Sequence, residues 1–293
     1  MITVNGLTKS FNGKVVVDNV SFLLEENTST ALIGPNGAGK TTILSMLTGL
    51  LAPTEGSVQL KGGGDIRSAI GFLPQYPQFF AWQTPKEALA LYGGLSGMSK
   101  GEVAARIDEV LQFVGLEEAK RKKIGTFSGG MKQRLGIAQA IMHKPKVLLL
   151  DEPVSALDPA GRREMMDLLK QLQQETTILY STHILNDAEQ MTDQVLFLKK
   201  GQLVERGSLT EVQQKFADPR IEVKFTNEMA AVQFAEAYAS AEHDGLFVSV
   251  MTEESDQEMA AMIAGLQNYG EQVVKVERKT ASLEEIFLKV AEQ

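Results

Sequence analysis

The N-terminal part of the chain alternates short β-prone segments with turn residues. Residues 2–4, 15–17 and 20–24 are rich in β-branched and other apolar side chains. Asn12 and Gly13 stand just before the second of these segments, and Asn-Gly between β-prone runs is a strong hairpin signal. The pattern therefore predicts an antiparallel sheet at the start of the chain.

Later apolar segments are continuous rather than alternating. Residues 30–33, 147–150 and 177–180 are almost wholly apolar, which is typical of strands that are covered on both faces. Helical patterns at residues 41–48 and 160–174 follow the first two segments. Strand, helix and strand in this order predict a parallel core sheet.

The remaining pattern predicts a helical insert and a second domain. Residues 76–145 favour helices, and Pro219 with its charged neighbours interrupts the pattern near a boundary that we expect at 217/218. The expected domains are therefore residues 1–217 and 218–293, and the second has the strand and helix alternation of a small α+β domain of ferredoxin-like type. Its expected strands are residues 221–225, 246–251 and 273–277, and its expected helices are residues 229–239, 257–266 and a last one from residue 282.

Composition excludes several classes of site and partner. The formal net charge is −8 and the pI is near 5.1, which disfavours nucleic acid as a partner. The chain has no cysteine, so disulfides and thiolate metal sites are excluded. The sequence begins without a secretory signal pattern and has no apolar run near the roughly 20 residues that a spanning helix needs. We expect a cytoplasmic protein whose only membrane role comes through a partner.

The segment after the first buried strand carries the strongest chemical signal. It matches the G-x-x-x-x-G-K-[ST] phosphate-binding pattern, and its place between an apolar strand and a helix supports that reading over an accidental glycine-rich turn. Its residues are Gly34, Pro35, Asn36, Gly37, Ala38, Gly39, Lys40 and Thr41. Backbone N–H groups of such a loop cradle phosphates, Lys40 adds a positive charge, and Thr41 is expected to ligate Mg²⁺.

Two further motifs narrow the chemistry. Asp151 and Glu152 directly follow the apolar run 147–150, where ionised carboxylates are costly unless paired or bound to metal. We expect Asp151 to face Mg²⁺ and Glu152 to act as the general base on water. The motif Ser128-Gly129-Gly130 opens a helical pattern, with Ser128 as a candidate N-cap beside N–H groups that can bind an anion.

Together these motifs resemble the nucleotide-binding subunits of ATP-binding cassette (ABC) transporters over residues 1–217. The resemblance implies an α/β P-loop NTPase cassette with a parallel core sheet, an antiparallel β subdomain and the helical insert, and it implies ATP and Mg²⁺ as cofactors. It assigns Phe11 to adenine stacking, Ser128, Gly129 and Gly130 to the signature motif, and His183 to the switch histidine. The implied nucleotide-binding residues also include Thr42, the implied catalytic residues are Glu152, His183 and Gln75, and the implied Mg²⁺ ligands are Thr41, Gln75 and Asp151.

The resemblance also implies partners. One cassette per chain implies a homodimer in which the signature motif of one copy faces the phosphate loop of the other, and a separate membrane permease that the chain serves from the cytoplasmic face. Tyr76 to Trp82 form an aromatic loop that we expect to dock the permease, although the same aromatics also fit the core of the insert. The C-terminal region, with the segment 282–287 near its end, resembles the extension found in the bacterial ABC-2 exporter group.

Some residues and functions fall outside this pattern. Phe127 and Met131 replace the commoner leucine and glutamine around the signature motif, and His143 and His243 match nothing. The alternative functions are a soluble ABC ATPase without a transporter, which usually has two cassettes or a long coiled coil, and a P-loop kinase or GTPase. The kinase or GTPase reading leaves Ser128-Gly129-Gly130 unexplained.

Overall fold

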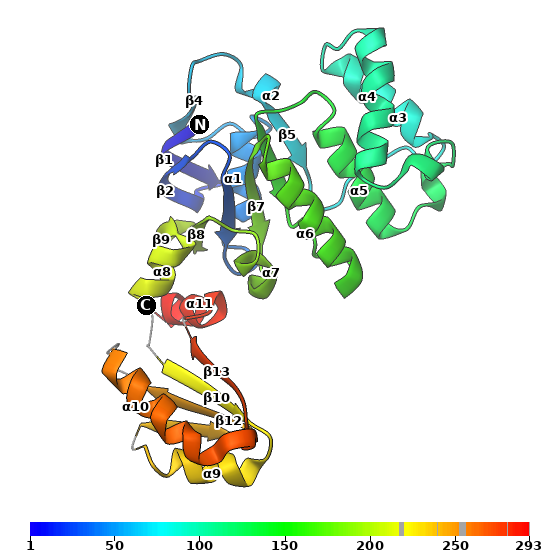
Figure 1. Cartoon of the computed structure of the whole chain (residues 1–293). Helices are drawn as coiled ribbons and strands as arrows, with labels where there is room; N and C mark the ends of the chain where they lie inside the picture. Colours follow the sequence, from blue (N-terminus) through cyan, green and yellow to red (C-terminus); the bar gives the residue numbers. More distant parts are fainter. Residues whose placement is uncertain (217–219, 239, 252–255, 280, 293) are drawn as a thin grey trace. The chain divides into compact units, whose positions relative to one another are not determined.

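The computed structural model describes residues 1–216, 220–238, 240–251, 256–279 and 281–292 (Figure 1). The chain divides into two compact units, Met1–Leu209 and Thr210–Gln293. The observed division falls before the boundary expected at 217/218, because helix α8 (Leu209–Lys215) groups almost entirely with the second unit. Residues 217 and 218 themselves lie outside the described residues.

The first unit begins with the predicted antiparallel sheet. Strands β1 (Ile2–Phe11), β2 (Lys14–Leu24) and β4 (Glu55–Leu60) pair in the order β2-β1-β4. Asn12 and Gly13 both have positive φ, 48° and 81°, which is the two-residue hairpin conformation that Asn-Gly favours. The hairpin signal is therefore confirmed.

The second sheet of the unit is the predicted parallel core. Its order is β5-β6-β7-β3-β8-β9, and only the β8–β9 pair is antiparallel. In a parallel sheet the carboxyl ends of the strands meet at one edge, so this order brings the ends of β3, β6 and β7 together. The strands are β3 (Ser29–Ile33), β5 (Ile70–Leu73), β6 (Val147–Asp151), β7 (Thr177–Thr182), β8 (Gln194–Lys199) and β9 (Gln202–Ser208).

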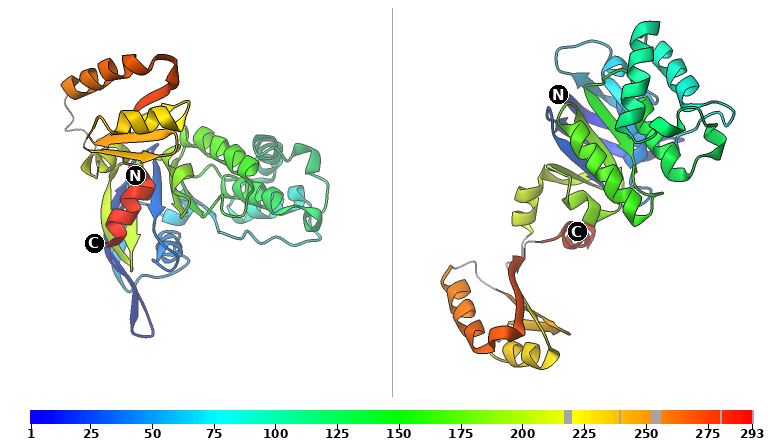
Figure 2. Two further views of the ribbon diagram at one scale, coloured as in Figure 1. Left: turned by 90° about the horizontal axis from the view of Figure 1, so that it is seen from below. Right: turned by 45° about the vertical axis from the view of Figure 1, so that its right-hand side comes forward.

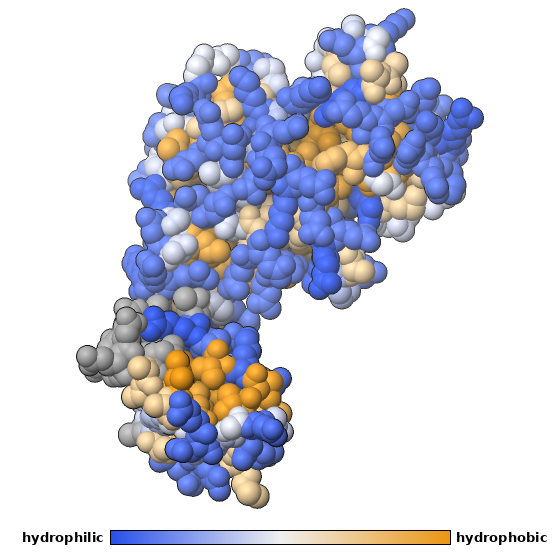
Figure 3. All heavy atoms as spheres, in the orientation of Figure 1, coloured by the Kyte–Doolittle hydropathy of each residue, from blue (hydrophilic) through white to orange (hydrophobic). Residues whose placement is uncertain are grey.

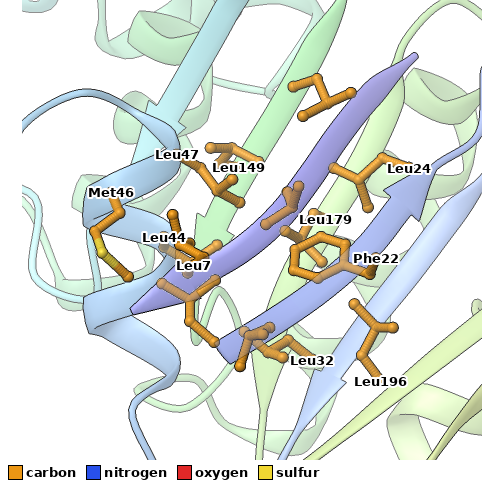
Figure 4. Packing of buried hydrophobic residues seen from close by; sticks show 14 of the residues in the cluster. Leu7, Phe22, Leu24, Leu32, Leu44, Met46, Leu47, Leu149, Leu179 and Leu196 are labelled. Carbon is orange, nitrogen blue, oxygen red and sulfur yellow. The ribbon is translucent and has the colours of Figure 1, made fainter. Parts of the chain in front are cut away.

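Helix α1 (Lys40–Leu47) is fixed by the core that it shares with both sheets. Ile43, Leu44 and Leu47 are fully buried. They belong to one apolar cluster with side chains of β1, β2, β3, β6 and β7, in which Figure 4 labels Leu44 and Leu47. Burial of this kind holds the start of the helix, and with it Lys40, in one position. The other helices of this core are α2 (Ile66–Ala69), α6 (Pro159–Gln173) and α7 (Leu185–Glu189).

The predicted helical insert is present. Figures 1 and 2 show helices α3 (Pro85–Leu95), α4 (Lys100–Phe113) and α5 (Gly129–Ala140) grouped to one side of the parallel sheet. Helices α3 and α4 each begin with a complete capping box, which explains why their starts are sharply defined. Short 3-10 turns η1 (Glu117–Ala119) and η2 (Ile124–Thr126) lie between α4 and α5.

The second unit contains the expected α+β fold. Its sheet has the order β11-β12-β10-β13 with every neighbour antiparallel, which is the ferredoxin-like arrangement. Phe225, Phe234 and Tyr269 pack ring against ring in its core. The elements are β10 (Arg220–Phe225), α9 (Glu228–Ala235), β11 (Ala241–Asp244), β12 (Phe247–Met251), α10 (Asp256–Leu266), η3 (Gln267–Gln272), β13 (Val273–Lys279) and α11 (Leu283–Glu292).

Strand β11 was not expected, because its four residues carry no apolar alternation. Within the part of the chain that the structure describes, no helix has the length and apolar character needed to cross a bilayer.

Candidate nucleotide-binding site

The phosphate-loop candidate connects β3 directly to α1. Gly34 must be glycine, because a Cβ there would lie 2.4 Å from the Leu198 carbonyl oxygen. Gly39 caps the helix with φ 107°, a left-handed conformation that residues with a side chain rarely adopt. These two glycines let the loop turn tightly against β8 and present the first N–H groups of α1 to one cleft.

The Lys40 ammonium is buried at the centre of this cleft. Its Nζ donates to the carbonyl oxygens of Gly34 at 2.7 Å and Pro35 at 3.3 Å, and lies 3.8 Å from Glu152 Oε1. Burial lowers the pKa of Lys40, while the nearby charges of Glu152 and Asp151 oppose that shift. The cation is thus held where it can meet an anion, by neutral carbonyls and a carboxylate.

Asp151 and Glu152 are placed by the end of β6 and by its neighbour β7. Ser181 on β7 donates its hydroxyl to Asp151 Oδ1 at 2.6 Å and accepts the backbone N–H of Glu152 at 2.9 Å. Both acidic residues are buried. The backbone of Glu152 has φ 48°, so the chain turns sharply there and sends the two carboxylates to different positions.

Gln75 and His183 both reach Glu152. Gln75 Nε2 donates to Glu152 Oε2 at 3.3 Å, and His183 Nδ1 lies 3.0 Å from the same oxygen. Gln75 follows β5 and His183 follows β7, so the parallel sheet brings both to the edge where β6 ends. The structure therefore gathers Lys40, Gln75 and His183 around one carboxylate.

Lys40, Gln75 and Glu152 line a cleft of about 370 Å³, and His183 is not among its lining residues. Thr41 and Thr42 also line it, and so does Val16, which the sequence reading had missed. Val16 lies in a plain β-branched run, so only its place in the folded hairpin reveals it. Ser181 was also missed. It lies directly opposite Asp151 in the parallel pairing of β6 with β7.

The three residues expected to ligate Mg²⁺ carry donor atoms that suit this ion. The Thr41 hydroxyl, the Gln75 amide and the Asp151 carboxylate offer hard oxygen atoms, and Mg²⁺ in such sites takes only one or two protein carboxylates beside substrate phosphates. Asp151 is almost fully buried, yet only its Oδ1 is engaged by Ser181. Among the described residues no cluster of three or more acidic or histidine side chains offers a separate all-protein metal cage.

The signature-motif residues lie elsewhere in the same chain. Ser128 caps α5, and its Oγ accepts the N–H of Met131 at 3.2 Å. Ser128, Gly129 and Gly130 line a different depression, of about 820 Å³, together with Leu157 and Asp158. The structure therefore does not bring these three residues to the Lys40 cleft.

Phe11 stands at the end of β1 with its ring partly exposed, and Lys9 Nζ lies 5.2 Å from the ring centroid. It is not among the residues that line the Lys40 cleft. The lysine lies over the ring in a cation–π contact, and 44% of the Phe11 surface remains exposed.

The aromatic loop is exposed rather than part of the core. Tyr76, Phe80 and Trp82 are 58–66% exposed, and Phe80 stacks on Trp82 at 5.5 Å between ring centroids. Only Phe79 turns inward, where it meets Tyr92 of α3 edge to face. Exposed aromatic side chains that lie together are typical of an interaction surface.

Comparison with known proteins agrees with the geometry. The family model "ABC transporter" matches residues 17–155, and "ATP-binding protein DrrA1-3-like, C-terminal domain" matches residues 207–291. The chain is 44% identical over 292 residues to the ABC transporter ATP-binding protein YxlF of Bacillus subtilis, covering 99% of each chain. It is 39% identical to the bacitracin transport ATP-binding protein BcrA of Bacillus licheniformis, over 70% of this chain and 69% of that one.

Solved structures give the same result. The dimeric ATP-binding cassette MJ0796, in a post-hydrolysis state with ADP and Pi, superposes with a TM-score of 0.65 and 29% identity, over 71% of this chain and 99% of that chain. The nucleotide cleft, the cassette fold and these matches lead to one conclusion: the chain belongs to the ATP-binding, ATP-hydrolysing proteins of ABC transporters.

Proposed function

We propose that this chain is the ATPase subunit of an ABC-2 type exporter and that it drives a separate membrane permease as a two-fold homodimer. The convergence of Lys40, Gln75 and His183 on Glu152 carries the proposal. A buried carboxylate with these neighbours is suited to accept a proton from water that attacks a phosphate held at Lys40.

The remaining residues of the cleft would bind the nucleotide. The backbone N–H groups of residues 34–42, with the exception of Pro35, which has none, would hold the phosphates, and the exposed ring of Phe11 would stack on adenine. Thr41, Gln75 and Asp151 would hold Mg²⁺, which neutralises phosphate charge when bound. Ser181 would keep Asp151 oriented by its 2.6 Å hydrogen bond.

A second copy would complete the site. Ser128, Gly129 and Gly130 lie at an exposed helix start away from the Lys40 cleft, so within one chain they have no phosphate to bind. The dimeric form of the MJ0796 cassette supports a two-fold arrangement here. ATP would then hold two cassettes together, and hydrolysis at Glu152 would release them.

The membrane partner would dock on the aromatic loop. Tyr76, Phe80 and Trp82 form an exposed aromatic surface directly after Gln75 in sequence, so docking and nucleotide contact share one loop. The chain would sit peripherally on the cytoplasmic face of the membrane. Relatives described as transport and resistance ATP-binding proteins favour this function over an ABC ATPase that acts without a permease.

Glu152→Gln tests the catalytic core of the proposal. The variant keeps the size and a hydrogen-bonding group but cannot accept a proton, so ATP binding should persist while turnover falls at least about hundredfold. With ATP it should accumulate as a dimer in light-scattering measurements. Glu55→Gln, on the exposed start of β4, is the matched control and should behave like the parent. Turnover at the parental rate in Glu152→Gln would remove Glu152 from the role of base.

Co-expression with a polytopic permease tests the transport role. The chain should fractionate with membranes only when the permease is present. Recovery of the chain in the supernatant under both conditions would count against an exporter subunit, and it would leave the ATPase result untouched.

A further inference from the structure

Strand β13 forms one edge of the sheet in the second unit. In the described residues it pairs only with β10, and the order β11-β12-β10-β13 leaves its other side without a neighbouring strand. An edge strand presents a row of backbone N–H and C=O groups that can pair with another strand. β13 is seven residues long and contains no proline, so it is long enough to do so.

The register with β10 assigns its side chains to two faces. Val276 lies opposite Val223, whose side chain is fully buried in the core on the helix side of the sheet. Lys275 and Glu277 lie opposite Lys224 and Glu222 and therefore project from the other face. The edge thus alternates an apolar position with charged positions of opposite sign.

The apolar positions at this edge are incompletely covered. Val276 is 37% exposed and Val274 is 55% exposed. Figure 3 shows a large apolar patch on the second unit. Apolar surface gathered at a strand edge favours pairing with another strand over solvent exposure.

We propose that β13 pairs with β13 of a second copy, antiparallel and centred on Val276, so that one sheet continues through two chains. In this register Val276 faces its own counterpart on the helix side. Lys275 of each copy faces Glu277 of the other on the opposite face. Two opposite-charge pairs and one apolar pair then stabilise the contact, each by a cross-strand interaction of the usual kind.

The neighbouring registers are less favourable. Directly opposed residues of an antiparallel pair must project from the same face of the sheet, so the two-fold axis must pass through a residue and not between two residues. The nearest alternative centres are therefore Lys275 and Glu277. A centre on Lys275 opposes the two Lys275 side chains, and a centre on Glu277 opposes the two Glu277 side chains. Only the centre on Val276 turns both residues into attractive pairs, because Lys275 and Glu277 are spaced symmetrically about it.

The charge pattern also favours pairing with a second copy of the chain over an edge strand that is protected from pairing. Proteins commonly guard an edge strand with charged side chains, especially lysine, whereas each lysine of β13 is matched by a carboxylate, Lys279 by Glu222 and Lys275 by Glu277. Within one chain Lys275 already forms an ion pair with Glu277. When two chains pair, this ion pair can be replaced by the two intermolecular pairs, so neither Lys275 nor Glu277 is left without an opposite charge.

A cysteine scan tests the contact and its register. The chain has no native cysteine, so Val276→Cys introduces a single thiol. Opposed residues in an antiparallel pair have Cα atoms about 4.5–5.5 Å apart, within the range that a disulfide spans. The full-length, nucleotide-free variant should therefore form a disulfide-linked dimer under mild oxidation.

Val274→Cys is the matched control on the same strand. Val274 is more exposed than Val276, yet in this register it faces residue 278 of the partner. The two Val274 Cα atoms would then lie about 14 Å apart, at roughly 3.4 Å per residue along the strand, too far for a disulfide. Equal cross-linking of both variants, or cross-linking of neither, would overturn the proposal.

Charge reversal separates the intermolecular pairs from the ion pair within one chain. Lys275→Glu and Glu277→Lys each place like charges opposite one another in a homodimer, so each variant alone should associate about tenfold more weakly than the parent in sedimentation equilibrium. Mixed in equal amounts, the two variants should recover association as heterodimers, because every opposed pair is then of opposite sign. The ion pair within each chain stays broken throughout.

Failure of the mixture to recover association would overturn the proposal, even if the single variants were weakened. All measurements are made without nucleotide, so the result is independent of ATP-driven pairing of the cassettes. A chain that shows ATP-dependent dimers but no β13 contact would retain the proposed function and lose only this inference.

Discussion

The hydroxyl of Ser181 and the carboxylate of Asp151 form a 2.6 Å hydrogen bond between neighbouring parallel strands. The same hydroxyl accepts the backbone N–H of Glu152, so one small side chain holds both acidic residues at the end of β6. All the groups involved are buried. This arrangement makes Ser181 a positioning residue for the proposed base, Glu152, and for the proposed Mg²⁺ ligand, Asp151.

Ser181→Ala should therefore reduce stability and turnover together. The change leaves a buried N–H and a buried carboxylate oxygen without their partner, which costs about 1–3 kcal/mol. Chemical denaturation measures the loss, and the ATPase rate should fall with it. Ser68→Ala, which removes an exposed hydroxyl from α2, should change stability by no more than about 0.5 kcal/mol. Equal effects from the two variants would contradict the role of Ser181.

Gly71→Ala should destabilise the contact between β5 and α5. A Cβ at Gly71 would lie 2.2 Å from the Ala140 carbonyl oxygen and 2.9 Å from Pro145 Cγ, so the backbone must move. Such overpacking costs about 1–3 kcal/mol. Gly94→Ala is the comparison: it lies on the exposed side of α3 with open space around it, and helix propensity should stabilise the protein by about 0.5–1 kcal/mol. Melting temperatures that move in the same direction would contradict the packing argument.

Tyr180→Phe should make stability less sensitive to alkaline pH. Burial raises the pKa of Tyr180, and its hydroxyl hydrogen-bonds Thr192 at 2.5 Å. The unfolded tyrosine ionises near pH 10, while the folded one keeps its proton to higher pH, so its contribution is present below about 10 and is lost as pH rises towards the folded pKa.

Urea unfolding at pH 8, 10 and 11 checks this expectation. The parent should be more stable than Tyr180→Phe by about 1 kcal/mol at pH 8, because the variant loses one buried hydrogen bond. The gap should shrink above pH 10, by up to about 1.4 kcal/mol per pH unit. A constant gap across this range would show that Tyr180 does not ionise differently in the two states.

Replacing Phe80 and Trp82 together by alanine should weaken membrane recruitment and leave basal ATPase activity intact. The two rings are exposed and stacked on each other, so their loss removes apolar surface without opening the core. Loss of two aromatic anchors of an interface costs about 2 kcal/mol or more, roughly thirtyfold in affinity for the permease. Leu50→Ala, at another exposed apolar position, is the control. Unchanged recruitment would move the docking surface away from the aromatic loop.

Much of the cassette was predictable because its chemistry is local in sequence. The spacing of the glycines and Lys40 in the loop from Gly34 to Thr41 predicts a phosphate-binding loop, and the apolar run before Asp151 predicts a buried strand. Ser181 and Val16 could not be found in this way, because they reach the site only through strand pairing over long sequence separations. Strand β11 was missed for a related reason: His243 and its neighbours form a polar edge strand that depends on β12 for its conformation.

The boundary between the two units could not be predicted from the sequence for a different reason. Sequence pattern marks a boundary where proline and charge interrupt it, near Pro219. The observed division at Leu209 depends on which unit α8 packs with, and that choice involves contacts that no local pattern records.

Glu152 contacts groups from three separate segments, because Lys40 begins α1, Gln75 precedes the aromatic loop and His183 follows β7. A ligand that draws any of them away from the carboxylate also changes the energy of the other two contacts. By thermodynamic linkage, a permease that favours one position of Gln75 must alter nucleotide affinity by the same factor by which the nucleotide alters affinity for the permease. The coupling can therefore be measured from either end, by titrating nucleotide with and without the membrane partner.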